Sequence, residues 1–247
     1  MTFQDHFSRQ ALGYTQFRPR YPRELFHFLG SLVARRQRVW DCGCGNGQAA
    51  AGLAEMFDEV IATDPSARQI AEAEPMARVT YLVATAEDCP LESHSVDLIT
   101  VAQALHWFDL PRFYVEVRRV GRSSGVLAAW CYGLATISPD VDRVIGHLYE
   151  DILGPYWPPE RKLIEERYAS LPFPFEELTA PPMAMAARWN LPDLMGYLET
   201  WSSVQRYIQR QGADPLDLVK PDLAAAWGEV STQAIRWPLY MRVGRID

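Results

Sequence analysis

A glycine-rich segment preceded by an acidic residue is the part of the sequence best suited to bind a ligand. In VWDCGCGNGQ, Asp41 stands just before Gly43, Gly45 and Gly47, between an apolar run and a helical pattern. Glycines allow a tight turn and let a ligand approach main-chain N–H groups closely. The start of the following helix adds partial positive charge that suits a carboxylate. The segment predicts a binding loop; a glycine turn without a ligand, and a capping role for Asp41, are the alternatives.

The spacing within this loop argues against a phosphate ligand. A dinucleotide-binding loop reads G-x-G-x-x-G, but Gln48 stands where the third glycine belongs. No Walker lysine follows the loop, and Asp41 beside it would repel a pyrophosphate. S-adenosylmethionine carries a cationic sulfonium and an ammonium group and has no phosphate, so an acidic neighbour favours it. The loop therefore fits this cofactor better than NAD.

A second acidic residue supports the same interpretation. Asp64 lies 21 positions after Gly43 (64 − 43), at the end of the next apolar run in EVIATDPS. Parallel strands bring their carboxyl ends to one edge of a sheet, where such folds bind ligands. A carboxylate there can accept hydrogen bonds from both hydroxyls of a ribose. The alternative is structural, because Asp-Pro-Ser is also a common helix-capping turn.

The elements that must position these residues alternate between two hydrophobic periods. One helical pattern covers 48–57. A second begins near Pro111, since proline suits the first turn of a helix. Apolar runs predict strands at 38–41, 59–63, 79–84, 96–102 and, after the turn GRSSG, 126–132. This alternation predicts an α/β fold in which helices cover both faces of a parallel sheet.

The second half of the chain predicts a helical cap. Helical patterns cover 140–153, 194–209 and 216–227, and strand patterns cover 182–189 and 235–243. Pro238 requires a bulge or an edge position in the last strand. The proline-rich stretch 156–182 suits a packed excursion or lid. We expect one domain over 1–247, with an N-terminal helical segment (1–30), a cofactor-binding core (31–135), a cap with the sixth strand (136–232) and a last strand (233–247).

Four segments together resemble a known family. VWDCGCGNGQ, EVIATDPS, ATAEDCP and SVDLITVAQALHWF are similar to the core motifs of class I S-adenosylmethionine-dependent methyltransferases. YTQFRPRYP, ETWSSVQRYIQ and WPLYMRVGR extend the resemblance to the type 11 group, which includes trans-aconitate methyltransferase-like proteins. The resemblance implies a Rossmann-like fold with a mostly parallel seven-stranded sheet and an antiparallel last strand. It also implies methyl transfer from S-adenosylmethionine to a small molecule, although core motifs do not specify the acceptor.

The resemblance also assigns residues to the cofactor. The implied cofactor-binding residues are Tyr14, Arg18, Asp41, Gly43, Gly45, Gly47, Asp64, Pro65, Ala86, Glu87, Gln103 and Ala104. Asp41, the glycines, Gln103 and Ala104 would lie along the methionine part, Asp64 at the ribose, and Ala86 and Glu87 at the adenine. Tyr14 and Arg18 would close over the cofactor. The alternatives are a solvated helix start at Glu87 and a stiff surface turn around Arg18.

Candidate acceptor residues follow the fourth strand and recur in the cap. His106 and Trp107 would orient the acceptor or, for His106, act as a base; a packed helix start is the alternative. Aromatic residues of the cap would form an acceptor pocket or plain core: Trp157, Trp201 and Tyr207. Arg188 and Arg206 would bind an acidic substrate, and solvation at the surface is the alternative for either one. A carboxylate acceptor is already ionised at neutral pH and needs no base. The resemblance, together with the absence of an obvious catalytic triad, implies the methyl ester of a small organic acid as product.

Composition limits the other functional classes. The 247 residues are 48% hydrophobic and 22% charged with a net charge of −7, which argues against a broad nucleic-acid surface. The sequence has no signal-peptide pattern and no membrane-spanning run, so we expect a cytoplasmic protein. Its four cysteines lack zinc spacing, and no metal is expected. An NAD-dependent oxidoreductase and a non-catalytic cofactor-binding regulatory module are the competing functions.

Overall fold

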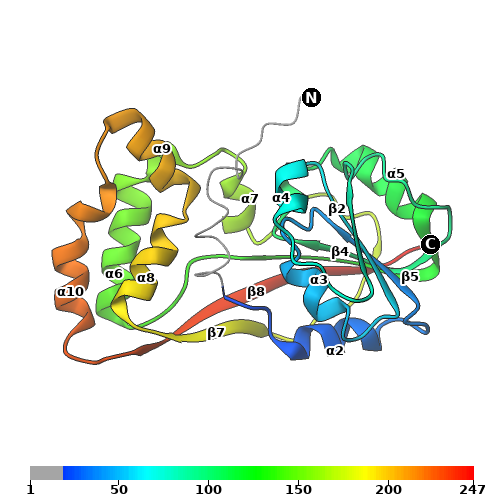
Figure 1. The fold of residues 1–247 in the computed structure, drawn as a ribbon, viewed down its shortest axis with the longest axis horizontal. Helices are drawn as coiled ribbons and strands as arrows, with labels where there is room; N and C mark the ends of the chain where they lie inside the picture. Colours follow the sequence, from blue (N-terminus) through cyan, green and yellow to red (C-terminus); the bar gives the residue numbers. More distant parts are fainter. Residues whose placement is uncertain (1–18) are drawn as a thin grey trace.

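The computed structural model describes residues 19–247, and a mostly parallel sheet forms its centre (Figure 1). The strand order is β3-β2-β1-β4-β5-β8-β6, with β7 also paired to β8. The strands are β1 Arg38–Cys42, β2 Glu59–Asp64, β3 Val79–Val83, β4 Val96–Ala102, β5 Gly121–Tyr132, β6 Glu176–Glu177, β7 Met183–Trp189 and β8 Gln233–Arg245. Strands β1 to β5 are parallel, whereas β8 runs antiparallel to β5. The predicted Rossmann-like sheet with an antiparallel last strand is confirmed.

Two strands share the sixth position of this sheet. The two-residue β6 and the seven-residue β7 both pair antiparallel with β8. Pro181 and Pro182 stand between them, and proline has no N–H to donate to a ladder. The residues that the structure describes thus hold eight strands where the sequence predicts seven, because the sixth is interrupted.

Helices cover both faces of the sheet, as predicted. Alternate side chains of β1 enter different apolar clusters: Val39 packs with residues of α2 and α3, and Trp40 packs with residues of α5. Figure 1 shows α2 and α3 on one side of the sheet and α5 on the other. The helices of this half are α2 Arg23–Ser31, α3 Gln48–Leu53, α4 Ala67–Ala71 and α5 Leu110–Val120. Helix α3 ends four residues before the predicted Phe57 (57 − 53).

Strand β5 begins earlier than the sequence predicts. The segment GRSSG was expected to form a turn, but β5 already starts at Gly121. The pairing of β5 with β4 changes register between Val96 and Leu98, so the predicted turn is an irregular first part of the strand. The regular pairing starts at Val126, where the apolar run of the sequence begins.

The cap is built from helices at the end of the sheet where β7 and β8 extend beyond the core (Figure 1). Its helical segments are α6 Pro139–His147, the π-helical η2 Leu148–Ile152, η3 Gly154–Tyr156, α7 Arg161–Glu165, α8 Leu191–Glu199, α9 Ser202–Gln211, η4 Pro215–Leu218 and α10 Lys220–Trp227. Short helix α7 and strand β6 both fall in the stretch 156–182, for which neither was predicted.

One helix predicted over 194–209 is two helices in the structure. Asn190 caps α8 together with Asp193 in a reciprocal capping box, which starts the helix at Leu191. The backbone of Trp201 is extended, with φ −69° and ψ 133°, and this separates α8 from α9. Because apolar residues continue at helical spacing on both sides of Trp201, the pattern alone gives no sign of the break.

Strand β8 ties the core to the cap. Leu239 to Arg245 pair with β5, and Gln233 to Leu239 pair with β7. Pro238 lies one residue beyond the end of the β5 pairing, which agrees with the predicted edge position. Trp237 is fully buried; its Nε1 donates a hydrogen bond of 3.2 Å to the Tyr197 hydroxyl on α8.

Two further observations concern the class of protein. Cys42, Cys44, Cys89 and Cys131 are all buried free thiols. Within residues 19–247, each helix is either too short or too polar to cross a bilayer.

The contact between α2 and α3 predicts a sharp difference between two helical glycines. A Cβ added at Gly52 would overlap the ring of Phe26, whereas one added at Gly146 of α6 would meet no atom within 4 Å. We expect Gly52→Ala to lower the free energy of unfolding by about 1–3 kcal/mol through overpacking. Gly146→Ala, the matched control, should raise it by about 0.5–1 kcal/mol through helix propensity. Urea denaturation measures both, and equal effects would contradict the tight α2–α3 contact.

Candidate functional site

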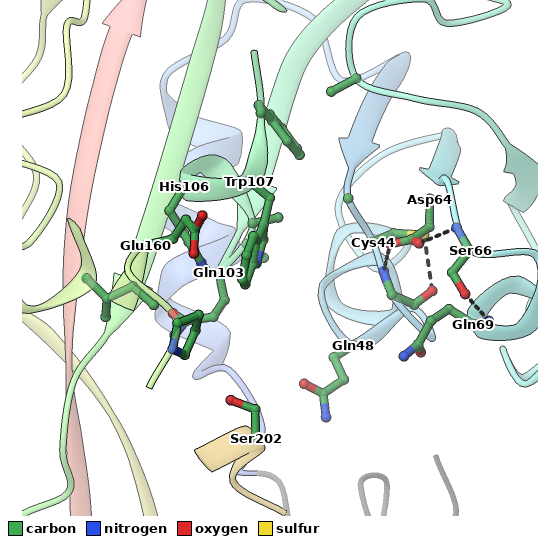
Figure 2. Close-up of a pocket in the computed structure, with 18 of the residues that line it drawn as sticks. Cys44, Gln48, Asp64, Ser66, Gln69, Gln103, His106, Trp107, Glu160 and Ser202 are labelled. Atoms are coloured by element: carbon green, nitrogen blue, oxygen red, sulfur yellow. Dashed lines mark hydrogen bonds between the residues drawn. The ribbon is translucent and has the colours of Figure 1, made fainter. Parts of the chain in front are cut away.

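A cavity of about 710 Å³ lies between the carboxyl ends of the parallel strands and the cap. Its lining runs from the Gly43–Gly45 loop and Asp64 to Trp157 and Trp201 of the cap. Figure 2 shows Cys44, Asp64, Ser66 and Gln69 on one side and Gln103, His106, Trp107 and Glu160 across from them. A volume of this size is typical of small-molecule sites, and the sheet edge is where doubly wound folds bind ligands.

The glycine loop forms one end of the cavity, and each glycine meets a different constraint. All three have positive φ: +69° at Gly43, +56° at Gly45 and +92° at Gly47. A Cβ at Gly43 would lie 2.7 Å from the Cβ of Ala104, and one at Gly47 would overlap the hydroxyl of Tyr81. At Gly45 the nearest atom would be the Gln69 Oε1, 3.9 Å away. Gly43 and Gly47 are therefore required by packing, whereas Gly45 leaves an open face toward the cavity. Gly43 and Gly45 line the cavity, but Gly47, which was predicted to bind the cofactor, does not.

Asp64 connects the end of β2 to this loop. Its Oδ2 accepts a hydrogen bond of 2.9 Å from the Gly45 N–H, and its Oδ1 accepts one of 2.9 Å from the Ser66 N–H (Figure 2). The Ser66 hydroxyl in turn accepts from the Gln69 N–H and caps α4. Asp64 and Pro65 both line the cavity, so the structural contacts of Asp64 leave its predicted ligand role open.

Asp41 lies behind the loop and does not line the cavity. It is fully buried; its Oδ1 accepts a hydrogen bond of 2.9 Å from the Thr100 hydroxyl, and its Oδ2 has no partner among residues 19–247. Burial raises the pKa of Asp41 to about 7; the Thr100 hydrogen bond opposes this rise and the charge of Asp64 adds to it. The structure therefore places Asp41 beneath the loop, not against the methionine part of a ligand.

The residues after β3 and β4 reach the same cavity. Ala86, Glu87, Gln103 and Ala104 all line it, and their contact with a cofactor stays a prediction. The Glu87 Oε1 accepts a hydrogen bond of 2.9 Å from the Asp109 N–H, which anchors the start of α5. Gln103 has φ +57°, and its Oε1 accepts a hydrogen bond of 2.8 Å from the Tyr132 N–H. Both polar side chains thus hold the cavity wall in place.

His106 and Trp107 lie on the 3-10 helix η1 (Leu105–Trp107), directly after β4. Both line the cavity, with their rings 4.8 Å apart. The His106 Nδ1 is 2.9 Å from the Tyr168 hydroxyl. Burial, and after it the positive charge of Arg161, lowers the pKa of His106 to about 3. The ring is therefore neutral at physiological pH and is a weak base.

An arginine that the sequence analysis did not select lies at the cap end of the cavity. The Arg161 Nε donates a hydrogen bond of 2.7 Å to the Tyr149 hydroxyl, and its guanidinium carbon is 4.7 Å from the centre of the Trp157 ring. No carboxylate of residues 19–247 forms an ion pair with it. Trp157 and Arg161 are four positions apart in the sequence, and this aromatic–cation spacing is the feature that could have pointed to Arg161.

The arginines predicted from the sequence lie elsewhere. Arg188 is exposed and donates to the Thr232 hydroxyl, and Arg206 donates to the Tyr156 carbonyl. Neither lines the cavity, which corrects that prediction. Trp157 and Trp201 are part of the wall, but Tyr207 packs against Tyr156 instead, with ring centres 4.9 Å apart. Tyr14 and Arg18 lie outside the described residues.

Comparison with known proteins agrees with this geometry. Residues 40–129 match the family model described as a methyltransferase domain. A Dictyostelium discoideum protein named as a methyltransferase is 38% identical over 247 aligned residues, covering 97% of this chain and 94% of that protein. The chain belongs to the class I S-adenosylmethionine-dependent methyltransferases.

Two other methyltransferases are similar to this protein, one in structure and one in sequence. A solved structure named as a type II methyltransferase from Anaeromyxobacter dehalogenans is 51% identical, with a TM-score of 0.88, and covers 93% of this chain and 98% of that one. A Saccharomyces cerevisiae protein named as an S-adenosylmethionine-dependent methyltransferase is 32% identical over 132 residues, 50% of this chain and 45% of that protein. The fold and the use of S-adenosylmethionine thus follow from the family, whereas the acceptor does not.

The buried Asp41 predicts a pH-dependent stability of the methyltransferase. Its pKa of about 7 in the folded state exceeds the ordinary value of 3.8, so folding takes up a proton between these pH values. The stability from this group is complete below about pH 4 and is lost as the pH rises through about 7, at up to about 1.4 kcal/mol per pH unit. Asp41→Asn stays neutral and keeps an acceptor for Thr100, so it should flatten the slope.

Urea unfolding at several pH values, without added nucleoside, measures this difference. Asp58→Asn, a change at an exposed residue, is the control and should keep the slope of the original protein. An unchanged slope in Asp41→Asn would show that Asp41 is ionised in the fold throughout this range.

Proposed function

We propose that this methyltransferase transfers the methyl group of S-adenosylmethionine to a small organic acid bound between the core and the cap. The cavity supports a small acceptor because one continuous space reaches from the glycine loop to the aromatic residues of the cap. The resemblance to trans-aconitate methyltransferase-like proteins supports an acidic acceptor.

The residues at the loop end fit the cofactor. Gly45 gives main-chain access on its open face, and the loop leads into the N-terminus of α3, which suits the cofactor carboxylate. Asp64 would hold the ribose, while Ala86 and Glu87 would flank the adenine and Gln103 and Ala104 the methionine part. The carboxylate of Asp64 beside the loop opposes a diphosphate, which disfavours the NAD-dependent alternative.

At the cap end of the cavity, the protonation state of His106 limits which acceptors can react. The cofactor supplies an electrophilic methyl group on a positively charged sulfur. The protein must hold a nucleophile in line with that methyl group, and such alignment contributes about 7–11 kcal/mol to rate enhancement. His106, with its pKa lowered to about 3, is a poor general base. This favours an acceptor that is already ionised, such as a carboxylate.

Arg161 is the observation that carries the proposal of an acid. Its guanidinium lies in the cavity wall against Trp157 and Tyr149, without a carboxylate partner among the described residues. A guanidinium that is fixed in this way can bind a carboxylate through two parallel hydrogen bonds. The neighbouring wall residue Glu160 favours acids that also carry a hydrogen-bond donor. The product would be a methyl ester.

Ligand binding tests the cofactor end of the proposal. We expect S-adenosylhomocysteine to stabilise the protein against thermal unfolding and NADH to have no effect. Asp64→Asn removes the charge that binds the ribose, and the loss of a charged hydrogen bond should weaken S-adenosylhomocysteine about 10–100-fold by calorimetry. Asp58→Asn should bind normally. Stabilisation by NADH alone would instead favour the oxidoreductase.

An acceptor screen tests the other end. With methyl-labelled S-adenosylmethionine, we expect label in base-labile esters of small organic acids. Arg161→Met, which keeps the length but removes the charge, should raise the KM for the acid at least about 10-fold, since a charged hydrogen bond contributes about 1.5–3 kcal/mol. Arg188→Met, at an arginine outside the cavity, should leave the KM unchanged.

Three outcomes would count against parts of the proposal. Label found only in hydroxyl or amine products would exclude ester formation. An unchanged KM in Arg161→Met would exclude the role of this arginine. Binding of the cofactor without transfer to any metabolite would favour the non-catalytic regulatory module.

A further inference from the structure

A tyrosine from the proline-rich stretch reaches beneath the cavity wall to His106. Tyr168 is fully buried, and its hydroxyl oxygen lies 2.9 Å from the His106 Nδ1. The two residues are 62 positions apart (168 − 106), and the rings are 5.9 Å apart. Because His106 follows β4 and lines the cavity, any constraint on its ring acts at the wall of the acceptor site.

The surroundings of the Tyr168 hydroxyl decide where its proton goes. Burial raises the pKa of Tyr168 well above its usual range, so the phenol keeps its proton at physiological pH. A buried hydroxyl proton needs an acceptor. Among the described residues the His106 Nδ1 is the hydrogen-bond partner of this hydroxyl, so Nδ1 is the acceptor for its proton.

The second ring nitrogen of His106 keeps accessible surface, and His106 lines the cavity. Nδ1 is bonded to Tyr168, and Nε2 has no hydrogen-bond partner in the described part of the chain. Nε2 is nevertheless not fully buried. It therefore keeps accessible surface, and His106 contributes that surface to the cavity wall.

We infer that Tyr168 is a positioning residue that fixes the tautomer of His106. The tyrosine O–H donates to Nδ1, so the imidazole carries its proton on Nε2. His106 then presents a hydrogen-bond donor to the cavity, not a base. Which molecule receives this hydrogen bond rests on the proposed function: there it is an oxygen of the acid acceptor, next to the guanidinium of Arg161.

The backbone of Tyr168 is held in an unfavourable conformation to keep this contact. Its φ is +60°, and that of Arg167 is +57°, in the left-handed region that non-glycine residues rarely adopt. The Arg242 Nη1 donates hydrogen bonds to the carbonyls of Tyr168 (3.1 Å) and Leu171 (2.8 Å). Glu177 pairs with the same guanidinium. This clamp from β8 and β6 orients Tyr168 toward His106.

Nitrogen-15 NMR of the uniformly labelled, ligand-free protein tests the tautomer directly. The His106 signal is assigned by its loss in His106→Gln. Between about pH 5.5 and pH 8 we expect a neutral ring with the proton on Nε2 and an unprotonated Nδ1. A proton on Nδ1, or titration of the ring within this range, would overturn the inference. The wild-type spectrum decides this even where a variant fails to fold.

Tyr168→Phe removes only the hydroxyl and is expected to give a mixture of the two tautomers. Tyr114→Phe is the matched control, because Tyr114 is also buried and its hydroxyl donates a 2.7 Å hydrogen bond to the Pro172 carbonyl in the same stretch. This control should keep the wild-type tautomer. A folded Tyr168→Phe protein with an unchanged tautomer would show that Tyr168 does not set it.

Turnover distinguishes a donor from a base once an acceptor is known. The amide nitrogen of glutamine lies near the position of Nε2, whereas that of asparagine lies near Nδ1. We expect His106→Gln to retain at least about 10-fold more kcat than His106→Asn. Equal losses would overturn the donor role. Since the NMR measurement needs no acceptor, a failure to detect methyl transfer would count against the proposed function and not against the tautomer.

Discussion

The structure depends first on one hydrogen bond between neighbouring strands, from the Gly45 N–H to the Asp64 carboxylate. Gly45 belongs to the loop after β1 and Asp64 ends β2, so this 2.9 Å contact fixes the loop against the sheet edge. The loop is confined from the other side by Ala104, which leaves no room for a side chain at Gly43. This end of the cavity is therefore held in position by contacts within the protein itself.

Much of this cofactor end could be predicted from the sequence because its determinants are local. Strand ends, glycine positions and the Asp-Pro-Ser turn are each encoded within a few residues, and the parallel sheet brings them together. Ala86, Glu87, Gln103 and Ala104 reached the cavity for the same reason. The different position of Asp41 could not be predicted, since a one-residue alternation decides whether a side chain points beneath a loop or into a site.

The acceptor end could not be predicted in the same way, because distant segments build it. Arg161 comes from a proline-rich stretch without a clear period, and it reaches the cavity through contacts with Tyr149 and Trp157. Tyr168 meets His106 across 62 positions of sequence (168 − 106). The break at Trp201 lies within a continuous apolar pattern and also could not be predicted from it.

The long strand β8 limits how molecules can enter and leave. It pairs with β5 in the core over residues 239–245 and with β7 over residues 233–239, so the two halves share one continuous backbone ladder. A rotation of the whole cap relative to the core would break backbone hydrogen bonds of β8. Trp157 and Arg161 border both the main cavity and a second hollow of about 310 Å³, so a movement of these two side chains would join the two spaces without disturbing the ladder. Arg161, which we propose binds the acid, would then also lie on the route by which the acid reaches the main cavity.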